Sequence, residues 1–246
     1  MKKKTFGLIG RNISYSFSPG YFNDKFKKVG LETYKYKKFD IADISHFKDI
    51  IESEGRLKGL NVTIPYKESV IPLLDSVSKT AGLIGAVNTI AISKKGKLKG
   101  YNTDHYGFKK ALKPLLKKYH KKALILGTGG ASKAVAFALR KMKIDYDFVS
   151  RKRTDVVYAY DDITPQLFEE YLIIINTTPL GTHPDTDACP PIDYTQFTGR
   201  HIAFDLVYNP PETLFLKQAK QNGAVIKNGH DMLIFQAEKS WEIWNR

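Results

Sequence analysis

The segment Ala123-Leu-Ile-Leu-Gly-Thr-Gly-Gly-Ala-Ser132 is the most informative about the fold of the second half of this chain. Its apolar residues predict a buried strand, and the glycines that follow allow a tight turn into a helix. A second strand is expected at Tyr146–Ser150, so the segment predicts a βαβ unit with parallel strands. In such a unit the glycines let the backbone approach a pyrophosphate closely, and the helix N-terminus binds that anion. An ordinary tight turn between strand and helix is the alternative.

The tip of the second strand bears on the choice of cofactor. An NAD site usually has Asp or Glu there for the ribose, whereas an NADP site has Arg for the 2′-phosphate. This chain has Ser150-Arg-Lys-Arg153 at the tip, and Asp147 lies inside the strand rather than at its end. The three cations favour NADP, with a solvated basic loop as the alternative.

Outward from this unit, short strands alternate with helical patterns, which predicts α/β layers. We expect two three-layer α/β domains with a cleft between them. The N-terminal substrate domain would have a mixed, mostly parallel sheet, and the second domain would be a Rossmann-like cofactor domain. A final helix at Asp231–Trp244 is expected to return to the first domain. The predicted boundaries are 1–102 plus 230–246 for the substrate-binding domain and 103–229 for the NADP-binding domain.

Two local features refine this outline. Ser18-Pro19 predicts the start of the first helix, with Ser18 as the N-cap and Pro19 at the first helical position. Phe22, Phe26 and Val29 share the apolar face of that helix. After residue 151 the chain is too short for a normal parallel crossover, which needs a dozen residues or more. We therefore expect one helix of the cofactor domain to be missing or shortened there.

The net charge raises the question of nucleic acid. The chain has 246 residues with 39 Lys and Arg against 25 Asp and Glu, a formal charge of +14. Much of the surplus is Lys in residues 1–40 and 94–122, whereas base recognition usually uses Arg. We therefore expect solvated basic faces and no nucleic-acid partner.

Apolar run length and cysteine count bear on cellular location and metal binding. No apolar run is long enough to span a membrane, and Arg11 interrupts the short apolar stretch near the N-terminus. We therefore expect a cytoplasmic protein without a membrane partner. The single cysteine, Cys189, excludes an internal disulfide framework and a multi-cysteine metal site.

Polar side chains gather at four places in the first domain that packing does not explain. These are Ser14–Pro19, Gly59–Glu68, Gly85–Thr89 and Gly100–Asp104. If the strands converge, the four clusters line one site. They could bind a small polyhydroxylated acid, with hydroxyls for its carboxylate and amides for its alcohols.

Taken in order, the motifs of this chain resemble those of the shikimate dehydrogenase family. The resemblance runs through Ser16–Pro19, Asn61–Lys67, Gly85–Thr89, Asn102–Gly107, Gly127–Ser132, Asn176–Gly181, Tyr208–Pro210 and Met232–Ala237. It implies a reversible, NADPH-dependent reduction of 3-dehydroshikimate to shikimate, a step toward chorismate and the aromatic amino acids. It implies no metal, and it leaves monomer or homodimer open.

The resemblance also implies a role for particular residues. Lys67 and Asp104 would form the catalytic pair. The substrate ligands would be Ser16 and Ser18 for the carboxylate, and Thr63, Asn88, Asp104 and Gln236 for the hydroxyls, with Asn61 and Tyr208 nearby. The cofactor ligands would be Gly127, Gly129, Gly130, Ala131, Ser132, Arg151, Arg153, Thr177 and Gly229.

Some alternatives stay open at this point. Ser18 and Asp104 could cap helices, Asn88 could tie two strands together, and Lys67 could be a surface lysine. Ser150 also stands where the family usually has Asn, so the NADP preference rests on the cations that follow it. The functional alternatives are a quinate/shikimate dehydrogenase that uses NAD, another two-domain NADP enzyme, and a non-catalytic nucleotide-binding relative.

Overall fold

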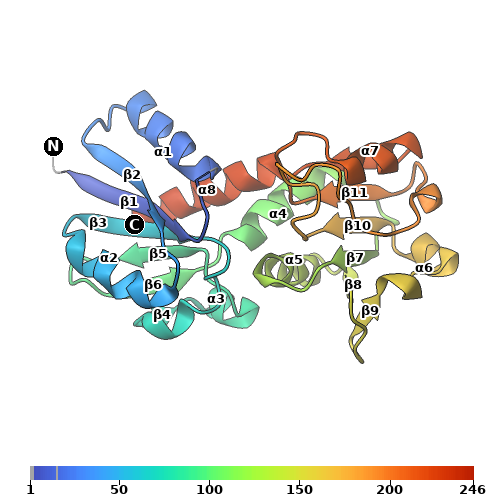
Figure 1. Ribbon diagram of the computed structural model, residues 1–246, viewed down its shortest axis with the longest axis horizontal. Coiled ribbons are helices and arrows are strands. Elements are labelled where there is room, and N and C mark those ends of the chain that lie inside the picture. The colour runs from blue at the N-terminus through green and yellow to red at the C-terminus, as the bar shows by residue number, and fades with distance from the viewer. Residues whose placement is uncertain (1–2, 15) are drawn as a thin grey trace. The chain divides into compact units, whose positions relative to one another are not determined.

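The computed structural model describes residues 3–14 and 16–246 and divides the chain into two compact units (Figure 1). The first unit holds Met1–Thr103 and Ala237–Arg246, and the second holds Asp104–Gln236. The chain returns from the second unit to the first between Gln236 and Ala237, inside the last helix, α8 (His230–Trp244). Gln236 and Ser240, one helical turn apart, therefore belong to different units.

The first unit is built on a six-stranded sheet in the order β2-β1-β3-β5-β6-β4. Its parallel pairs are β1 with β2, β1 with β3, and β4 with β6, whereas β5 is antiparallel to β3 and β6. The elements are β1 (Lys4–Gly10), α1 (Phe17–Lys28), β2 (Tyr34–Asp40), η1 (Ile44–His46), α2 (Phe47–Ser53), β3 (Leu57–Val62), η2 (Ile71–Leu73), β4 (Ser76–Val77), α3 (Lys79–Ile84), β5 (Thr89–Ile92) and β6 (Leu98–Tyr101).

Alternating side chains of the strands fill two cores, one on each face of this sheet. In β1, Phe6 and Leu8 pack toward α1 and α8, whereas Ile9 packs toward α2. Trp244 anchors α8 to the sheet, because its Nε1 donates to the carbonyl of Ile90 at 2.9 Å. A side chain at Gly59 would collide with this indole, since a Cβ there would lie 2.1 Å from Nε1.

The start of α1 differs from the prediction. Ser16, not Ser18, is the N-cap residue, and the helix begins at Phe17. Pro19 therefore lies at the third helical position, which is tolerated because the first-turn N–H groups have no partner inside the helix. Val29 is the C-cap residue and is 55% exposed, because the helix ends before it can join the buried face of Phe22 and Phe26.

The second unit contains a fully parallel six-stranded sheet in the order β12-β11-β10-β7-β8-β9. The order reverses between β7 and β10, and ligands of doubly wound sheets bind beyond the carboxyl ends of the strands at such a switch point. The elements are α4 (Asp104–Leu112), η3 (Lys113–Leu115), β7 (Lys122–Leu126), α5 (Gly130–Lys141), β8 (Asp145–Ser150), β9 (Val157–Ala159), η4 (Tyr160–Asp162), α6 (Pro165–Glu170), β10 (Ile173–Asn176), η5 (Tyr194–Gln196), β11 (Ile202–Asp205), α7 (Leu214–Gln221), β12 (Val225–Lys227) and the first half of α8.

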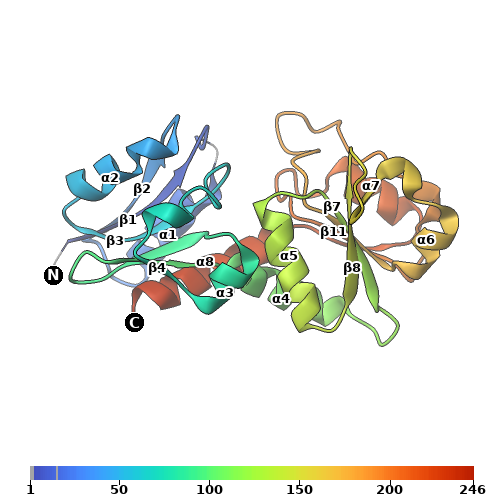
Figure 2. The ribbon, with the colours of Figure 1, turned by 90° about the horizontal axis from the view of Figure 1, so that it is seen from below.

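Helices cover both faces of this second sheet (Figure 2). On one face α4, α5 and the start of α8 pack against Ala123 and Ile125 of β7. On the other face α6 and α7 pack against Leu124 and Leu126 of the same strand. This burial of both faces explains why β7 is an uninterrupted apolar run rather than an alternating one.

The connection from β8 to β9 contains no helix. Residues 151–156 alone join the two parallel strands, and Val157 pairs with Phe148. An isolated bridge between Thr154 and Val157 turns the chain back. The covering helix that a βαβ crossover normally supplies is therefore absent at this described edge of the sheet.

Among the described residues, no helix combines the length and the apolar character needed to cross a membrane.

Candidate active site

Backbone hydrogen bonds of the first unit bring four predicted site residues together at the end of β3. Asn61 pairs with Thr89 in the β3–β5 ladder, and the N–H of Thr63 donates to Ile9 at the end of β1. The carbonyl of Lys67 accepts from the N–H of Val87 at 2.7 Å, which holds Lys67 beside the segment that carries Asn88. Thr63 and Lys67 are half-buried, whereas Asn61 and Asn88 are buried.

Ser18 reaches this group through Tyr36. Ser18 is buried in the first turn of α1, and its hydroxyl makes a hydrogen bond with the phenol of Tyr36. Burial raises the pKa of the Tyr36 phenol well above its usual value, so Tyr36 stays neutral and donates to Asn61 Oδ1 at 2.7 Å. Ser16, the N-cap residue, is half-buried, and its side chain makes no capping hydrogen bond to α1.

Asn61 uses both ends of its amide inside the protein. Its Oδ1 accepts from Tyr36, and its Nδ2 lies within 3.0–3.2 Å of Ser240 Oγ, Thr89 Oγ1 and the carbonyl of Asn88. Asn61 therefore connects α8, β5 and Tyr36 of β2 through its amide.

The side-chain amide of Asn88 makes two hydrogen bonds to Thr103, the residue before Asp104. Its Oδ1 accepts from the N–H of Thr103 at 2.7 Å, and its Nδ2 donates to Thr103 Oγ1 at 2.9 Å. Thr103 is 1% exposed. The chain segment at Asn102–Asp104 is therefore tied to the strand that starts after Asn88.

Sequence reasoning missed three hydroxyl residues, Thr89, Thr103 and Ser240, which we call the hydroxyl cluster. Their oxygens lie 2.8–3.3 Å from one another, and all three side chains are buried. A signal was present in the sequence, because Asn88-Thr89 and Asn102-Thr103 repeat the same dipeptide. Nothing local pointed to Ser240.

Asp104 and Gln236 lie on α4 and α8, two helices of the second unit that touch at Gly107. Asp104 is the buried first residue of α4, where the helix dipole favours a carboxylate. One turn later, a Cβ at Gly107 would lie 2.4 Å from the carbonyl of Met232 and 3.1 Å from the backbone N of Gln236. Gly107 thus permits close contact between α4 and α8, and Gln236 itself is 7% exposed.

The glycine turn after β7 has the geometry that a phosphate group requires. Gly127 has φ +108, and a Cβ there would lie 2.7 Å from Thr177 Oγ1. Gly129 is the N-cap of α5, so no side chain caps the first turn, and a Cβ there would meet nothing within 4 Å. The first-turn residues Gly130, Ala131 and Ser132 therefore present N–H groups and open space to an anion.

Neighbouring contacts hold this turn in place. Ser132 Oγ donates to the carbonyl of Gly129 at 2.6 Å, and Thr177 Oγ1 donates to the carbonyl of Leu126 at 2.7 Å. Gly229 donates its N–H to Val207, and a Cβ there would lie 2.1 Å from the carbonyl of Leu206. Thr177 and Gly229 thus occupy tight positions in loops that follow β10 and β12.

The predicted phosphate-binding cations lie in the 151–156 connection. Arg151 and Arg153 are both exposed. Arg153 forms an ion pair with Asp162, with Nη1 3.1 Å from Oδ1. Burial raises the pKa of the Tyr160 phenol, and the positive charge of Arg151 opposes that rise in part. An exposed ion pair contributes only about 0–1 kcal/mol, so a phosphate can compete for Arg153. The turn and the tip together fit a dinucleotide with a 2′-phosphate.

A buried pair at the carboxyl ends of β10 and β11 was also missed. Asn176 Nδ2 donates to Asp205 Oδ1 at 3.0 Å, and Asp205 accepts further bonds from Thr213 Oγ1 and the N–H of Val207. Burial raises the pKa of the Asp205 carboxyl to about 7. The pair fixes the loop that carries Tyr208, a half-buried residue.

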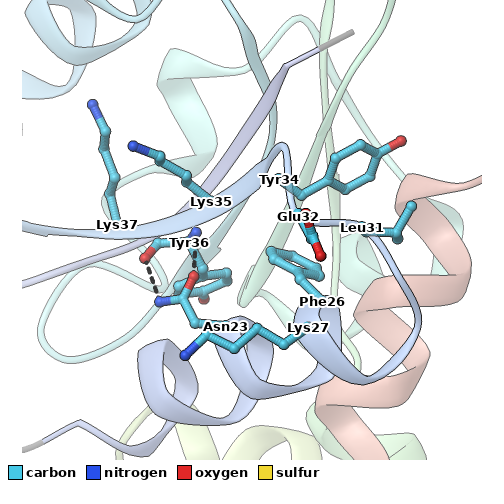
Figure 3. Close-up of a pocket in the computed structure, with 9 residues that line it drawn as sticks. All are labelled: Asn23, Phe26, Lys27, Leu31, Glu32, Tyr34, Lys35, Tyr36 and Lys37. Carbon is cyan, nitrogen blue, oxygen red and sulfur yellow. Dashed lines mark hydrogen bonds between the residues drawn. The ribbon is translucent and has the colours of Figure 1, made fainter. Parts of the chain in front are cut away.

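A surface pocket of about 440 Å³ lies between α1 and β2, with Tyr36 in its lining (Figure 3). The amide of Asn23 bonds both the N–H and the carbonyl of Tyr36 there, at 2.9 and 3.1 Å. None of the predicted site residues lines the pocket, so it is not part of the candidate site. No group of three or more His, Cys, Asp or Glu positioned to hold a metal occurs among the residues described.

Known proteins match this chain along its length. The family model for the shikimate dehydrogenase substrate-binding domain matches residues 8–90. A protein of Methanosphaera stadtmanae named shikimate dehydrogenase (NADP(+)) is 38% identical, covering 97% of this chain and 90% of the relative. A protein of Carboxydothermus hydrogenoformans with the same name is 38% identical, covering 98% and 91%.

Solved structures agree with these sequences. The shikimate dehydrogenase of Thermus thermophilus, crystallised with NADP(H) and shikimate, has a TM-score of 0.86 at 32% identity, covering 98% of this chain and 93% of its own. The quinate dehydrogenase of Corynebacterium glutamicum, crystallised with NAD, has a TM-score of 0.86 at 27% identity, covering 98% and 93%. With near-complete coverage at 38% identity, the chain belongs to the shikimate dehydrogenase family.

Proposed function

We propose that this protein is an NADP-dependent shikimate dehydrogenase that interconverts 3-dehydroshikimate and shikimate. The observation that carries the proposal is the group at the end of β3, where Thr63, Lys67 and Asn88 are held together by backbone hydrogen bonds. A lysine beside hydroxyl and amide groups suits a ligand with several hydroxyls and one carbonyl to be protonated. The family to which the chain belongs supplies the identity of that ligand.

The chemistry divides between cofactor and protein. The bound nicotinamide supplies the hydride in reduction and accepts it in oxidation. Lys67 Nζ donates a proton to the oxygen of the former carbonyl during reduction, and it takes that proton back during oxidation. The carboxylate of Asp104 accepts a hydrogen bond from the reacting hydroxyl and so orients it. One hydride and one proton convert the ketone to the alcohol, which balances the reaction.

The remaining residues bind the substrate. Ser16 and Ser18, at the start of α1, would donate hydroxyl hydrogen bonds to the substrate carboxylate. Thr63, Asn88 and Gln236 would bind the hydroxyls that do not react. Tyr208 would contribute from the loop after β11, which Asp205 holds through the N–H of Val207.

The cofactor would be held at the switch point of the second sheet. Gly127, Gly129 and the first turn of α5 would bind the pyrophosphate. Arg151 and Arg153 would bind the 2′-phosphate, and Thr177 and Gly229 would lie near the ribose and nicotinamide. The protein would act in the cytoplasm as a monomer or homodimer, with substrate and cofactor as its small-molecule partners.

A matrix of four steady-state assays tests the proposal. The value of kcat/KM is measured for shikimate and for quinate, each with NADP⁺ and with NAD⁺. The highest value is expected for shikimate with NADP⁺. Turnover of neither substrate would refute the proposed activity, because a non-catalytic nucleotide-binding relative has no turnover.

A quinate/shikimate dehydrogenase using NAD is the second candidate. The specific observation in its favour is the ion pair that Arg153 makes with Asp162, which occupies one of the two arginines. Arg151→Ala separates the candidates. If Arg151 binds the 2′-phosphate, this change raises KM for NADP⁺ by about tenfold or more while KM for NAD⁺ changes little. Lys118→Ala, at an exposed lysine outside the strand tip, is the control, and equal effects of Arg151→Ala on both cofactors would contradict NADP specificity.

A further inference from the structure

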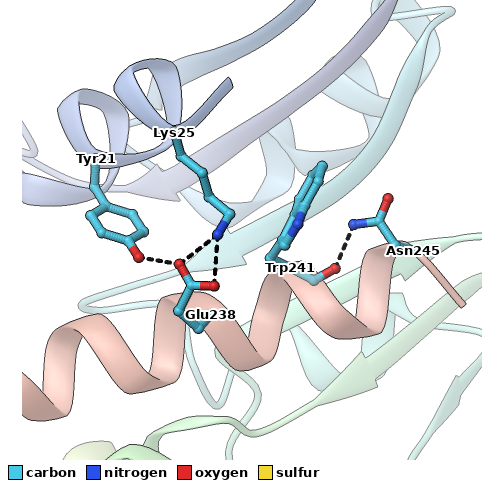
Figure 4. Close-up of polar contacts among 5 residues, drawn as sticks. All are labelled: Tyr21, Lys25, Glu238, Trp241 and Asn245. Atoms are coloured by element: carbon cyan, nitrogen blue, oxygen red, sulfur yellow. Dashed lines mark hydrogen bonds and ion pairs between the residues drawn. The ribbon is translucent and has the colours of Figure 1, made fainter. Parts of the chain in front are cut away.

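The C-terminal half of α8 is fixed to the rest of the first unit on several sides. On one side, Glu238 accepts from Tyr21 and from Lys25 of α1, at 2.7 Å from Lys25 Nζ (Figure 4). At the end of the helix, Trp244 Nε1 donates to the carbonyl of Ile90 in β5. Ser240 lies between these anchors and is 0% exposed. Its hydroxyl therefore has little freedom to move.

The hydroxyl of Ser240 meets three side chains that come from three other segments. Its Oγ lies 3.0 Å from Asn61 Nδ2 at the end of β3 and 2.8 Å from Thr89 Oγ1 at the start of β5. It also lies 3.2 Å from Thr103 Oγ1, after the end of β6. These partners are up to 179 positions away in sequence. Ser240 is thus a shared point of attachment for the strand ends that form the candidate site.

One of the attached residues, Thr103, leads directly to two groups with proposed roles in the reaction. Thr103 is held by both ends of the Asn88 amide, so the position of its hydroxyl sets the orientation of that amide. Thr103 also precedes Asp104 in the chain, so a shift of Thr103 moves the backbone that carries the carboxylate. A misplacement of about 1 Å at a reacting group can cost roughly 100-fold in rate.

We propose that Ser240 is a positioning residue that sets the orientation of Asn88 and Asp104 through Thr103. The proposal rests on the proposed function, because it assigns Ser240 to the same site. Ser240 itself touches neither substrate nor cofactor in this scheme. Its hydroxyl restricts the hydroxyl cluster to one hydrogen-bonded arrangement, and a buried polar network with all members satisfied specifies such a unique arrangement.

Ser240→Ala tests the proposal by steady-state kinetics with shikimate and NADP⁺. We expect kcat to fall by about tenfold, KM for shikimate to rise by less than about threefold, and KM for NADP⁺ to stay unchanged. Ser78→Ala is the matched control, because Ser78 Oγ caps α3 in the same unit by accepting from Ala81 N–H. This control loses stability without touching the hydroxyl cluster, and its kcat is expected to equal that of the wild type.

A second readout does not depend on turnover. The N–H of Thr103 donates to Asn88 Oδ1, so its hydrogen exchange is expected to be slow in the wild type and faster in Ser240→Ala, but unchanged in Ser78→Ala. Unchanged exchange at Thr103 in Ser240→Ala, or a kcat equal to that of the wild type, would overturn the positioning role. If the wild type itself does not oxidise shikimate, the proposed function fails and the exchange result alone judges the role of Ser240.

A second variant keeps the proposal testable if Ser240→Ala fails to fold. If Ser240→Ala does not fold, Ser240→Cys takes its place, because cysteine keeps the shape of the side chain with a somewhat larger end atom and is only a weak hydrogen-bonding group. A fall of kcat by roughly threefold or more at unchanged KM supports the proposal. A wild-type kcat in Ser240→Cys refutes it.

Discussion

At the scale of single residues, Lys67 is the group on which the chemistry depends most. Its carbonyl accepts from the N–H of Val87, the residue before Asn88, and Lys67 as a whole is half-buried. Lys58 is also half-buried but lies inside β3, and Lys79 is exposed at the start of α3. The position of Lys67 in a polar group, and not its charge, separates it from the many lysines of this chain.

Lys67→Ala is expected to lower kcat with shikimate and NADP⁺ by about 100-fold or more, because proton transfer by a positioned side chain contributes roughly that much. KM for shikimate should rise far less, since hydroxyl and amide groups still bind the substrate. Steady-state kinetics at saturating NADP⁺ measures both constants. Lys79→Ala is the control at an exposed lysine, and a near-normal kcat in Lys67→Ala would refute the catalytic role.

At the scale of elements, two glycines differ in what a side chain at their position would meet. Gly107 lies where α4 contacts α8, and Gly129 is the N-cap of α5. A Cβ at Gly107 would press against the carbonyl of Met232, so Gly107 sets the distance between α4 and α8. A Cβ at Gly129 would meet nothing within 4 Å, and its φ of −77 suits any residue. The first glycine is therefore needed by the fold, and the second leaves space for a ligand.

Replacing each of these glycines by Ala should have different consequences. Gly107→Ala is expected to destabilise the protein by about 1–3 kcal/mol, because overpacking forces the two helices apart. Gly129→Ala is expected to keep a wild-type Tm but to raise KM for NADP⁺, since the methyl group stands where the pyrophosphate would lie. Thermal unfolding measures the stability of the two variants, and steady-state kinetics with varied NADP⁺ measures KM. A Gly129→Ala enzyme with the wild-type KM for NADP⁺ would show that the glycine turn does not bind the cofactor.

At the scale of the whole molecule, titration of buried groups determines how stability depends on pH. The Asp205 carboxyl has an ordinary pKa of 3.8, and burial in the second unit raises it to about 7. The folded state therefore binds this proton more tightly than the unfolded state. Its stabilising contribution is complete below pH 3.8 and is lost as the pH rises to about 7.

Asp205→Asn isolates this contribution, because Asn keeps an acceptor but does not titrate. The free energy of unfolding of the wild type minus that of Asp205→Asn is expected to fall by up to about 1.4 kcal/mol per pH unit between roughly pH 4 and pH 7. Urea unfolding at several pH values measures the difference. Asp193→Asn is the control with the opposite sign, because hydrogen bonds from Thr195 and Gln196 lower the pKa of Asp193. A pH-independent difference for Asp205→Asn would contradict the raised pKa.

What the sequence determined by itself was local. The apolar run Ala123–Leu126, the glycines behind it and the short connection after Ser150 predict strand, turn, helix and missing crossover, because periodicity and chain length act over a few residues. Residue types at the motifs likewise indicated the family, with which the full-length relatives agree. The N-cap of α1 was wrong by two positions, since Ser16 and Ser18 are both good capping residues and only packing chose between them.

Which polar groups meet depends on contacts between segments that are distant in the sequence. Ser240 joins Asn61 across 179 positions, and Asn176 joins Asp205 across 29, so no local pattern could reveal either contact. Each contact exists because the sheet order brings distant strand ends together and because a buried polar group must find a partner there. The sequence therefore named the residue types of a dehydrogenase, whereas the fold determined which of them hold the others in position.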